Sequence, residues 1–515
     1  MTSKFKLIAR SSSFRVFQTI GTIIIGFLMM PFLIRTLGED LYGLWIVIGS
    51  VVGTYYLLDL GFSQAVTRYV TKFIHQNNPD GANRIINTAL VIYSALGIVV
   101  LFASMAAARY GAESLMDGSE NLSLAQTILI LTGLAFALEF PSKAFPGIVS
   151  AYMRYDFLAI VRLCKSVIDA LLIFLFLSNG YGLVAMALIT LATGLVSTSI
   201  FIWFTTSLFK EIRFSKSLID MSTFKEVFNF SKWVFLFDIN TMIKGKMDIW
   251  FIAFFHSSTA VTIYYVSVRL TEYALTFLSQ ATGITGPIFT EHYAKDEVKQ
   301  LRRSVVAFLK IDILLGSVFL SGFILLGEDF ILLWMGESFD SRQAYICLII
   351  LALGRFTVYF SSPLHSLLMT INKHNLSAWV SLGETVLSLI LCWLLIPNYS
   401  IAGAAIAISF PYLIGRIIII PLLTARQMEL PLLHLAIRIS MFTILTLSLL
   451  WVSEQFYFST ATPSLALLTI FAPIIAVIQL IVGGTLFNNE ELQWIRQTLS
   501  NNIRFFRKSG IPKDA

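Results

Sequence analysis

The chain is divided into long apolar blocks, and these blocks limit what it can fold into. Each block holds about 20 residues or more, the length that a helix needs to cross a bilayer. Only 13% of the 515 residues are charged, against about 25% in soluble domains. The pattern predicts an all-α polytopic membrane protein with about fourteen transmembrane helices. The expected spans are residues 14–35, 41–67, 85–108, 123–148, 157–177, 182–207, 228–254, 259–288, 304–326, 342–368, 375–396, 401–424, 433–453 and 463–487.

Charged residues in the loops between the spans predict the orientation in the membrane. Lysine and arginine gather in one set of loops, including residues 68–84, 210–225 and 295–303, whereas the other set is acidic. Because basic loops stay in the cytoplasm, both termini are expected to be cytoplasmic. The net charge of +7 then reflects orientation, and no nucleic-acid partner is expected.

The two halves of the chain resemble each other at a fixed spacing. Leu158 aligns with Leu376, and Leu183 with Ile401, both 218 residues apart with no gap. A six-helix unit repeated once predicts two pseudo-symmetric lobes with a cleft between them, a common transporter plan. The predicted domains are an N-lobe (1–207), a cytoplasmic linker (208–227), a C-lobe (228–424), two C-terminal helices (425–487) and a basic amphipathic tail (488–515) on the membrane surface.

One predicted span, Ser231–Phe255, is apolar but carries Asp238, Lys244, Lys246 and Asp248. An ionised side chain at bilayer depth costs about 2.5–3.5 kcal/mol on insertion scales, so these groups are not expected to face lipid. They predict a partner helix or a water-filled cavity. Which lysine faces that cavity stays open, because the two lie about 200° apart around a straight helix.

Other charges within the spans come in pairs at helical spacing. Such a pair shares one helix face and can neutralise itself, so both a structural and a functional role remain open. Lys310 and Asp312 lie nearer the predicted cytoplasmic end of their span, where snorkelling to the headgroups explains them. The pairs are Lys244–Asp248, Lys165–Asp169, Glu139–Lys143 and Arg269–Glu272.

The charges that pairing leaves over are mostly positive. Arg355 and Arg416 have no acid within one turn, and Glu384 is a candidate partner for one of them. Asp59 has no base near it in the sequence. The surplus predicts a cationic cavity for an anionic substrate, since arginine and lysine are the usual partners of phosphate. The predicted substrate-binding residues are Lys244, Lys246, Arg269, Arg355 and Arg416, with Asp59, Asp248 and Glu384 as coupling groups or charge partners.

The sequence contains no motif for catalysis or for a bound cofactor. It has no GxxxxGK[ST] phosphate loop, no HExxH zinc motif and no Ser-His-Asp pattern. Cys164, Cys347 and Cys392 lie in apolar blocks without metal-ligand or redox spacing. We expect a transporter and not an enzyme, with no cofactor and no metal site.

Two motifs near the N-terminus resemble a known family. Pro31–Trp45 follows the pattern P-x-x-I-R-T-L-G-x-x-x-Y-G-L-W, and Asp59–Tyr69 follows D-L-G-F-S-x-A-x-x-R-Y. Both resemble the polysaccharide-export branch of the MOP/MATE superfamily, the Wzx-like flippases of undecaprenyl-pyrophosphate-linked oligosaccharides such as the O-antigen precursor. One departure is that no charge lies between Arg15 and Arg35, where some relatives place an arginine.

The resemblance implies a fold and a set of cavity residues. It implies two helical bundles around a central cationic cavity that opens alternately to the two sides of the bacterial inner membrane. Helices one, two, seven and eight line the cavity in that family. By this resemblance, the residues expected in the cavity are Asp59, Lys244, Lys246, Asp248 and Arg269.

Three functions are weighed. The first is a flippase for lipid-linked oligosaccharide, with membrane lipids, a polysaccharide polymerase and chain-length machinery as its expected partners. The second is a cation-coupled multidrug exporter of the MATE type, which needs an unpaired acid such as Asp59 or Glu384. The third is a glycan polymerase or ligase, which needs large outer loops that this chain lacks. The positive surplus favours the first.

Overall fold

The structure is a computed structural model that describes residues 2–59, 62–112, 122–283, 285–430, 432–458, 465–487 and 491. The described chain is helical and contains no strand, because its apolar blocks satisfy their own backbone hydrogen bonds only as helices. The contacts within the chain divide it into two compact units. The first unit is Met1–Tyr265 with Ile396–Ala404, and the second unit is Val266–Leu395 with Ala405–Ala515. The predicted lobe boundaries at 207 and 228 remain a prediction.

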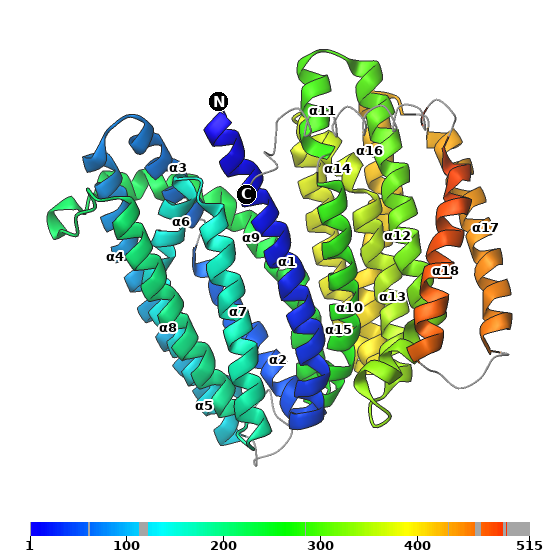
Figure 1. Cartoon of the computed structure of the whole chain (residues 1–515), viewed down its shortest axis with the longest axis horizontal. Coiled ribbons are helices and arrows are strands. Elements are labelled where there is room, and N and C mark those ends of the chain that lie inside the picture. Colours follow the sequence, from blue (N-terminus) through cyan, green and yellow to red (C-terminus); the bar gives the residue numbers. More distant parts are fainter. Residues whose placement is uncertain are drawn as a thin grey trace, which may run out of the picture. The chain divides into compact units, whose positions relative to one another are not determined.

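The first unit contains helices α1 to α9, the start of α10 and the Ile396–Ala404 part of α15 (Figure 1). Its elements are α1 (Thr2–Leu37), α2 (Glu39–Thr54), the 3-10 helix η1 (Tyr55–Asp59), α3 (Phe62–His75), α4 (Pro79–Ala106), the π-helix η2 (Ala107–Gly111), α5 (Leu122–Glu139), the 3-10 helix η4 (Phe140–Lys143), α6 (Ala144–Ala151), α7 (Tyr155–Ser178), α8 (Leu183–Leu208), the 3-10 turn η5 (Lys216–Leu218), α9 (Met221–Phe255) and the start of α10 (Ser258–Thr282).

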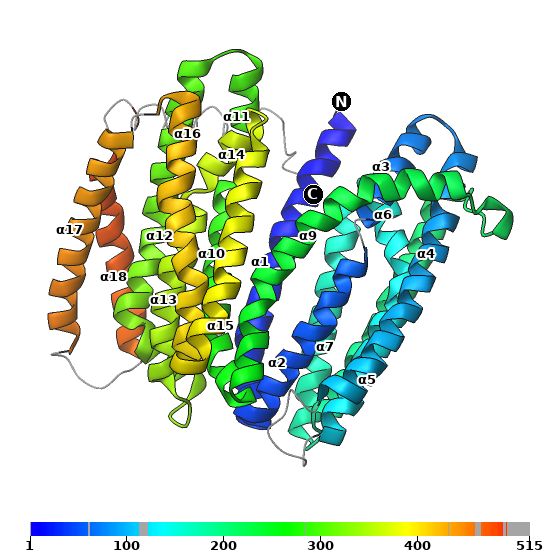
Figure 2. The same ribbon diagram turned by 180° about the vertical axis from the view of Figure 1, so that it is seen from behind.

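The second unit contains the remaining helices (Figure 2). They are the end of α10, α11 (Thr285–Ala294), α12 (Val298–Met335), α13 (Ser341–Phe360), α14 (Ser362–Thr370), α15 (His374–Leu413) except for its Ile396–Ala404 part, the π-helix η6 (Ile414–Ile419), α16 (Ile420–Met428), α17 (Leu432–Phe458), α18 (Leu465–Gly483) and the short η7 (Gly484–Leu486).

The predicted helix count agrees with the structure. Within the described residues, ten segments are long and apolar enough to span a membrane, one of them the 55-residue segment His374–Met428. That segment holds two predicted spans, separated at Ser400, which has φ 49° and ψ −135°. The ten segments thus account for eleven of the fourteen predicted spans. The remaining three spans are helices α7, α9 and α10, which carry charged residues within their apolar sequence. The predicted orientation remains a prediction, and apart from Glu491 the predicted tail lies outside the described residues.

Packing within each unit follows the apolar faces. In the first unit α1 lies along α7, α5 packs between α4 and α8, and α9 contacts α2, α3 and α4. In the second unit α12 packs against α13 and α18. The predicted linker is held to α4, because the side chains of Asn83 and Asn87 bond the backbone of Glu211, Arg213 and Ser215. The linker is thus part of the first unit over its described residues.

Candidate functional site

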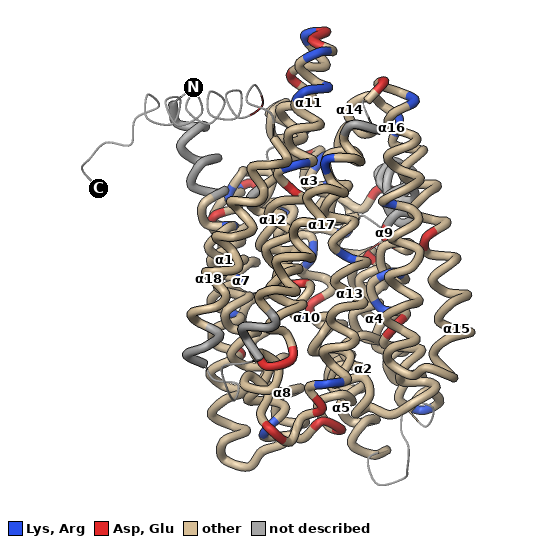
Figure 3. Tube along the Cα trace, turned by 90° about the vertical axis from the view of Figure 1, so that its right-hand side faces the viewer, with Lys and Arg blue, Asp and Glu red and all other residues tan. Residues whose placement is uncertain are grey.

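Charged residues occur partway along the helices as well as at their ends (Figure 3). On α9, Asp248 is 1% exposed, and it accepts hydrogen bonds from the Tyr264 hydroxyl at 2.8 Å and from the Ile249 backbone at 2.9 Å. Lys244 and Lys246 are half-buried in the same helix. The helix continues through Gly245, so the two lysines keep different faces. Asp248 therefore fixes α9 to α10 through Tyr264.

Asp59 is a buried carboxylate at the end of η1, 3% exposed. The Tyr93 hydroxyl donates to Oδ1 at 2.5 Å and the Ser63 hydroxyl donates to Oδ2 at 2.7 Å. These short bonds to a carboxylate are of the charge-assisted kind. Asp59 has no base near it in the sequence. In the structure, the ammonium group of Lys143 interacts electrostatically with its carboxylate.

Lys143 lies in the 3-10 helix η4, beside Pro141. Its ammonium sits over the Phe140 ring at 3.9 Å, with the rings of Phe136 and Tyr56 at 5.0 and 5.1 Å. Its nitrogen is buried and has no hydrogen-bond partner among the described residues. The predicted ion pair with Glu139 is therefore wrong, because a 3-10 helix has three residues per turn and does not align residues four apart.

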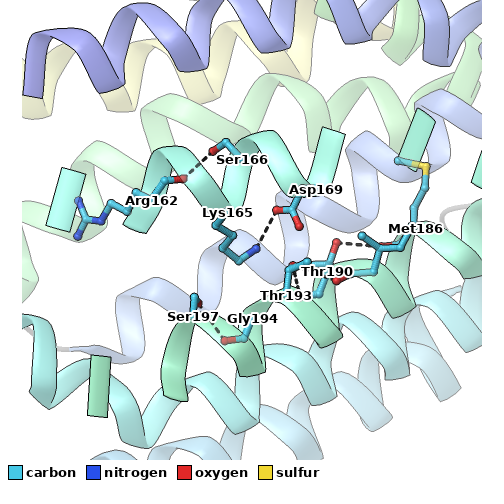
Figure 4. Close-up of polar contacts among 10 residues, drawn as sticks. Arg162, Lys165, Ser166, Asp169, Met186, Thr190, Thr193, Gly194 and Ser197 are labelled. Carbon is cyan, nitrogen blue, oxygen red and sulfur yellow. Dashed lines mark hydrogen bonds and ion pairs between the residues drawn. The ribbon is translucent and has the colours of Figure 1, made fainter. Parts of the chain in front are cut away.

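Lys165 and Asp169 on α7 form the predicted i,i+4 pair, with 2.9 Å between Nζ and Oδ2. Figure 4 shows the pair pointing toward α8, where Gly194 and Thr193 lie. The Glu139 carboxylate occupies the space that a Cβ at Gly194 would need. Glu139 also lies within the electrostatic reach of Lys143, Lys165 and Asp169.

These five residues form the unit 1 charge cluster: Asp59, Glu139, Lys143, Lys165 and Asp169. Two lysines face three carboxylates, so the cluster carries one formal negative charge. This cluster therefore does not supply the positive surplus that the sequence predicts.

The second unit brings two predicted arginines to one glutamate, and we call these residues the unit 2 arginine site. Glu272 on α10 lies 3.0 Å from Arg269 and 3.7 Å from Arg355 of α13. Arg355 also donates to the Thr271 hydroxyl at 3.5 Å. The Arg355 side chain is 14% exposed, whereas those of Arg269 and Glu272 are 40% and 43% exposed. Glu272 thus holds guanidinium groups from two helices, α10 and α13.

Arg416 meets Glu384, as one of the two candidate pairings predicts. Arg416 Nη2 donates to Glu384 Oε2 at 2.9 Å, and Nε lies 2.8 Å from Oε1. Both side chains are buried, at 9% and 3% exposure. Arg416 also lines a cavity of about 740 Å³ within the second unit. The other lining residues are apolar or hydroxyl-bearing and come from α12 to α17 and from η6, such as Leu320, Phe360, Leu422 and Phe442.

Lys310 does not snorkel as predicted. It is 3% exposed, and its ammonium bonds both carboxylate oxygens of Glu491, at 2.8 and 2.7 Å. The partner lies 181 residues away, so sequence spacing holds no signal for it. The same is true of Tyr93, which lies 34 residues from Asp59. Ser63 lies only four residues after Asp59, but serine is not a residue type that marks a site.

Among the described residues no three His, Cys, Asp or Glu side chains converge in the way that a bound metal ion would need. Guanidinium and ammonium groups, a phenol and hydroxyls can bind phosphate and sugar oxygens.

Residues 32–343 match a family described as "Polysaccharide biosynthesis protein". The chain is 20% identical over 320 residues to the uncharacterized membrane protein EpsK of Bacillus subtilis, covering 61% of this chain and 62% of EpsK. The chain thus spans less than two thirds of EpsK. It is 22% identical to the probable low-salt glycan biosynthesis flippase Agl15 of Haloferax volcanii, over 76% of this chain and 78% of Agl15. It is also 22% identical to a protein of Shigella flexneri named as an O-antigen transporter, over 80% of this chain and 96% of that protein.

Solved structures share the fold. The lipid II flippase MurJ in an inward closed conformation aligns with a TM-score of 0.68 and 16% identity, over 93% of this chain and 99% of MurJ. An inward-facing multidrug resistance MATE transporter of the MOP superfamily aligns with a TM-score of 0.67 and 15% identity, over 80% of this chain and 94% of that chain. The resemblance seen in the two N-terminal motifs is therefore confirmed, and this multi-pass membrane protein with a MATE-like transporter fold belongs to the polysaccharide biosynthesis protein family.

Proposed function

We propose that this protein is a flippase that moves undecaprenyl-pyrophosphate-linked oligosaccharide across the bacterial inner membrane by alternating access. Its family and the relatives named as a glycan flippase and an O-antigen transporter support this assignment. Its transporter fold supports a role in transport and not in catalysis. A polysaccharide polymerase and the chain-length machinery are the expected partners.

The observation that carries the proposal is the unit 2 arginine site. A guanidinium presents donors in a fixed fork that matches phosphate, and two of them suit the adjacent phosphates of a pyrophosphate. Glu272 pairs with both arginines. A pyrophosphate would replace that carboxylate as the partner of Arg355 and Arg269. The partial exposure of Glu272 and Arg269 leaves room for this exchange.

Two further features support an amphiphilic substrate. Lys244 and Lys246 place two half-buried ammonium groups on α9 of the first unit. The cavity of about 740 Å³ in the second unit is almost wholly apolar and suits a hydrocarbon chain. An anionic head and an isoprenoid tail on one molecule would use both kinds of surface.

The test is the substitution Arg355→Ala, with Arg342→Ala as the matched control. Both arginines lie on α13. Arg342 is at the start of that helix, is 68% exposed, and pairs with Glu328 of α12. Losing a charge-assisted hydrogen bond costs about 1.5–3 kcal/mol, so Arg355→Ala should weaken substrate binding about 10- to 100-fold. Surface polysaccharide in a deletion strain and flipping rate in proteoliposomes are the measurements, with protein level checked by immunoblot.

Lys246→Ala is expected to reduce surface polysaccharide as well, since it removes half-buried positive charge from α9. Normal polysaccharide with both Arg355→Ala and Lys246→Ala, at normal protein level, would refute the flippase proposal. An equal loss with Arg342→Ala would show that the effect is general and not specific to the arginine site.

A cation-coupled multidrug exporter of the MATE type is the second candidate. The observation in its favour is the buried carboxylate of Asp59, held by Tyr93 and Ser63. A carboxylate of this kind can take a proton or attract a cationic drug. A drug-susceptibility panel on a deletion strain separates the candidates, because an exporter alone would make the strain sensitive while leaving its polysaccharide intact.

A further inference from the structure

One carboxyl group in the second unit is buried without a partner. Asp312 lies on α12 and is 0% exposed. Neither of its carboxylate oxygens has a hydrogen-bond partner among the described residues. No described lysine or arginine nitrogen lies within ion-pair distance of it either. This carboxyl differs from Asp59, Asp248 and Glu384, each of which is bonded or paired.

Two hydroxyl groups from neighbouring helices lie beside Asp312. They belong to Thr282, the last residue of α10, and Tyr359, on α13. Both instead approach the backbone carbonyl of Leu278, at 3.4 and 3.5 Å. The two hydroxyl groups near Asp312 therefore donate to the Leu278 carbonyl and not to the Asp312 carboxyl group. Each hydroxyl is nonetheless a donor that acts on Asp312.

The charged groups on the helices around Asp312 have other partners. Tyr359 is the titratable side chain that faces it from α13, and α10 contributes only the Thr282 hydroxyl. Lys310, on the same helix, is held by Glu491. On the helices packed against α12, the described groups are engaged as follows: Glu291 with Lys295 and His292 with Glu297 on α11, His365 with Ser377 on α14, and Arg438 with the Leu486 carbonyl on α17.

An ionised carboxylate in this setting is costly. Moving an unpaired charge from water into a protein interior costs several kcal/mol even after relaxation, and the group is neutralised instead. A proton is the smallest group that neutralises it, and it needs no coordination shell. The carbonyls at the C-terminal end of α10 carry partial negative charge, which also favours a bound positive species.

We propose that Asp312 is a proton-binding site that is loaded in the conformation seen here. Loading forms one O–H bond on the carboxylate with a proton from water, and unloading returns one proton to water. In the unloaded state Thr282 and Tyr359 must turn from Leu278 to the carboxylate. Proton binding at Asp312 thus exchanges two hydrogen-bond arrangements between α10, α12 and α13.

The same helices carry the unit 2 arginine site. Arg355 lies four residues before Tyr359 on α13, so both side chains share one face of the helix. Glu272 and Arg269 lie on α10, the helix that ends at Thr282. A shift of α10 against α13 would change the distance between Glu272 and Arg355. This link between the proton and the substrate rests on the proposed function, whereas the proton site itself does not.

The test is infrared difference spectroscopy of the full-length protein in lipid nanodiscs with isotope-labelled aspartate. Stepping the pH upward should remove the carbonyl stretch of a protonated carboxylic acid, shifted by the label. Asp312→Asn should abolish that band, while Asp296→Asn, at an exposed turn between α11 and α12, should leave it unchanged. A wild-type protein without the band, or an Asp312→Asn protein that keeps it, overturns the proposal.

Two further arms keep the test decisive. If Asp312→Asn does not fold, Tyr359→Phe should still shift the midpoint of the wild-type band, and an unshifted midpoint overturns the proposed geometry. If sodium but not choline removes the band at constant pH, the occupant is a sodium ion and the proton assignment is wrong. The spectrum needs no oligosaccharide, so it can succeed even if the flippase proposal fails.

Discussion

Glu384 and Arg416 join two predicted spans through one buried ion pair. Glu384→Ala would leave the Arg416 guanidinium buried without its carboxylate. Breaking a buried pair in this way costs about 3–5 kcal/mol. We expect a clear fall in the melting temperature of the detergent-purified protein, measured by intrinsic fluorescence.

The matched control for this prediction is Glu291→Ala. Glu291 is exposed and pairs with Lys295, and the hydrogen bond from that ammonium lowers the pKa of the carboxyl. Surface pairs of this kind add little stability. The melting temperature should therefore stay unchanged in the control, and an equal fall in both variants would show that the effect is not specific to the buried Glu384–Arg416 pair.

Residue spacing predicts a local ion pair only where the helix is regular. Lys165–Asp169 and Arg269–Glu272 form as predicted, because α7 and α10 keep the α-helical repeat there. Lys143 instead rests on Phe140, because the chain changes to a 3-10 helix at Pro141. Lys143 is an exception because the backbone changes locally from an α-helix to a 3-10 helix. Pro141 in the sequence suggests such a change, but it does not specify which conformation forms.

At the scale of elements, the contact between α2 and α10 depends on a glycine. A Cβ at Gly43 would overlap the backbone carbonyl of Ser258, and backbone cannot move aside as a side chain can. Small residues allow membrane helices to approach this closely. Gly43→Ala should therefore destabilise the protein by about 1–3 kcal/mol, the cost of overpacking, measured as a lower melting temperature.

Gly49, on the same helix, provides the control. A Cβ there would meet nothing within 4 Å. Because alanine favours a helix over glycine by about 0.8–1.0 kcal/mol, Gly49→Ala should be neutral or slightly stabilising. If Gly43→Ala behaves like Gly49→Ala, the close contact between α2 and Ser258 does not exist in the membrane.

At the scale of the whole molecule, the distribution of basic loops predicts the orientation. A fluorescent protein fused after Ala515 should fold and fluoresce, since both termini are expected in the cytoplasm. A cysteine introduced in the acidic loop at Glu113 should react with a membrane-impermeant thiol reagent added from outside. The background should lack Cys164, which is exposed. A dark fusion with an unreactive loop would reverse the predicted orientation.

The sequence by itself determines that this chain is a multi-pass helical membrane protein, where its helices lie, and which charges one turn apart can pair. These properties are local, since a span needs only about 20 apolar residues and a pair needs only helical spacing.

Only the tertiary structure decides which distant charges meet. It joins Arg355 to Glu272 and Asp59 to Tyr93, and it buries Asp312 with no hydrogen-bond partner among the residues that the structure describes. The physical reason is that lipid-facing and protein-facing surfaces of these helices are both apolar, so hydrophobic periodicity carries little information about the rotation and depth of a helix. Those two quantities determine which charge faces which, and packing alone sets them.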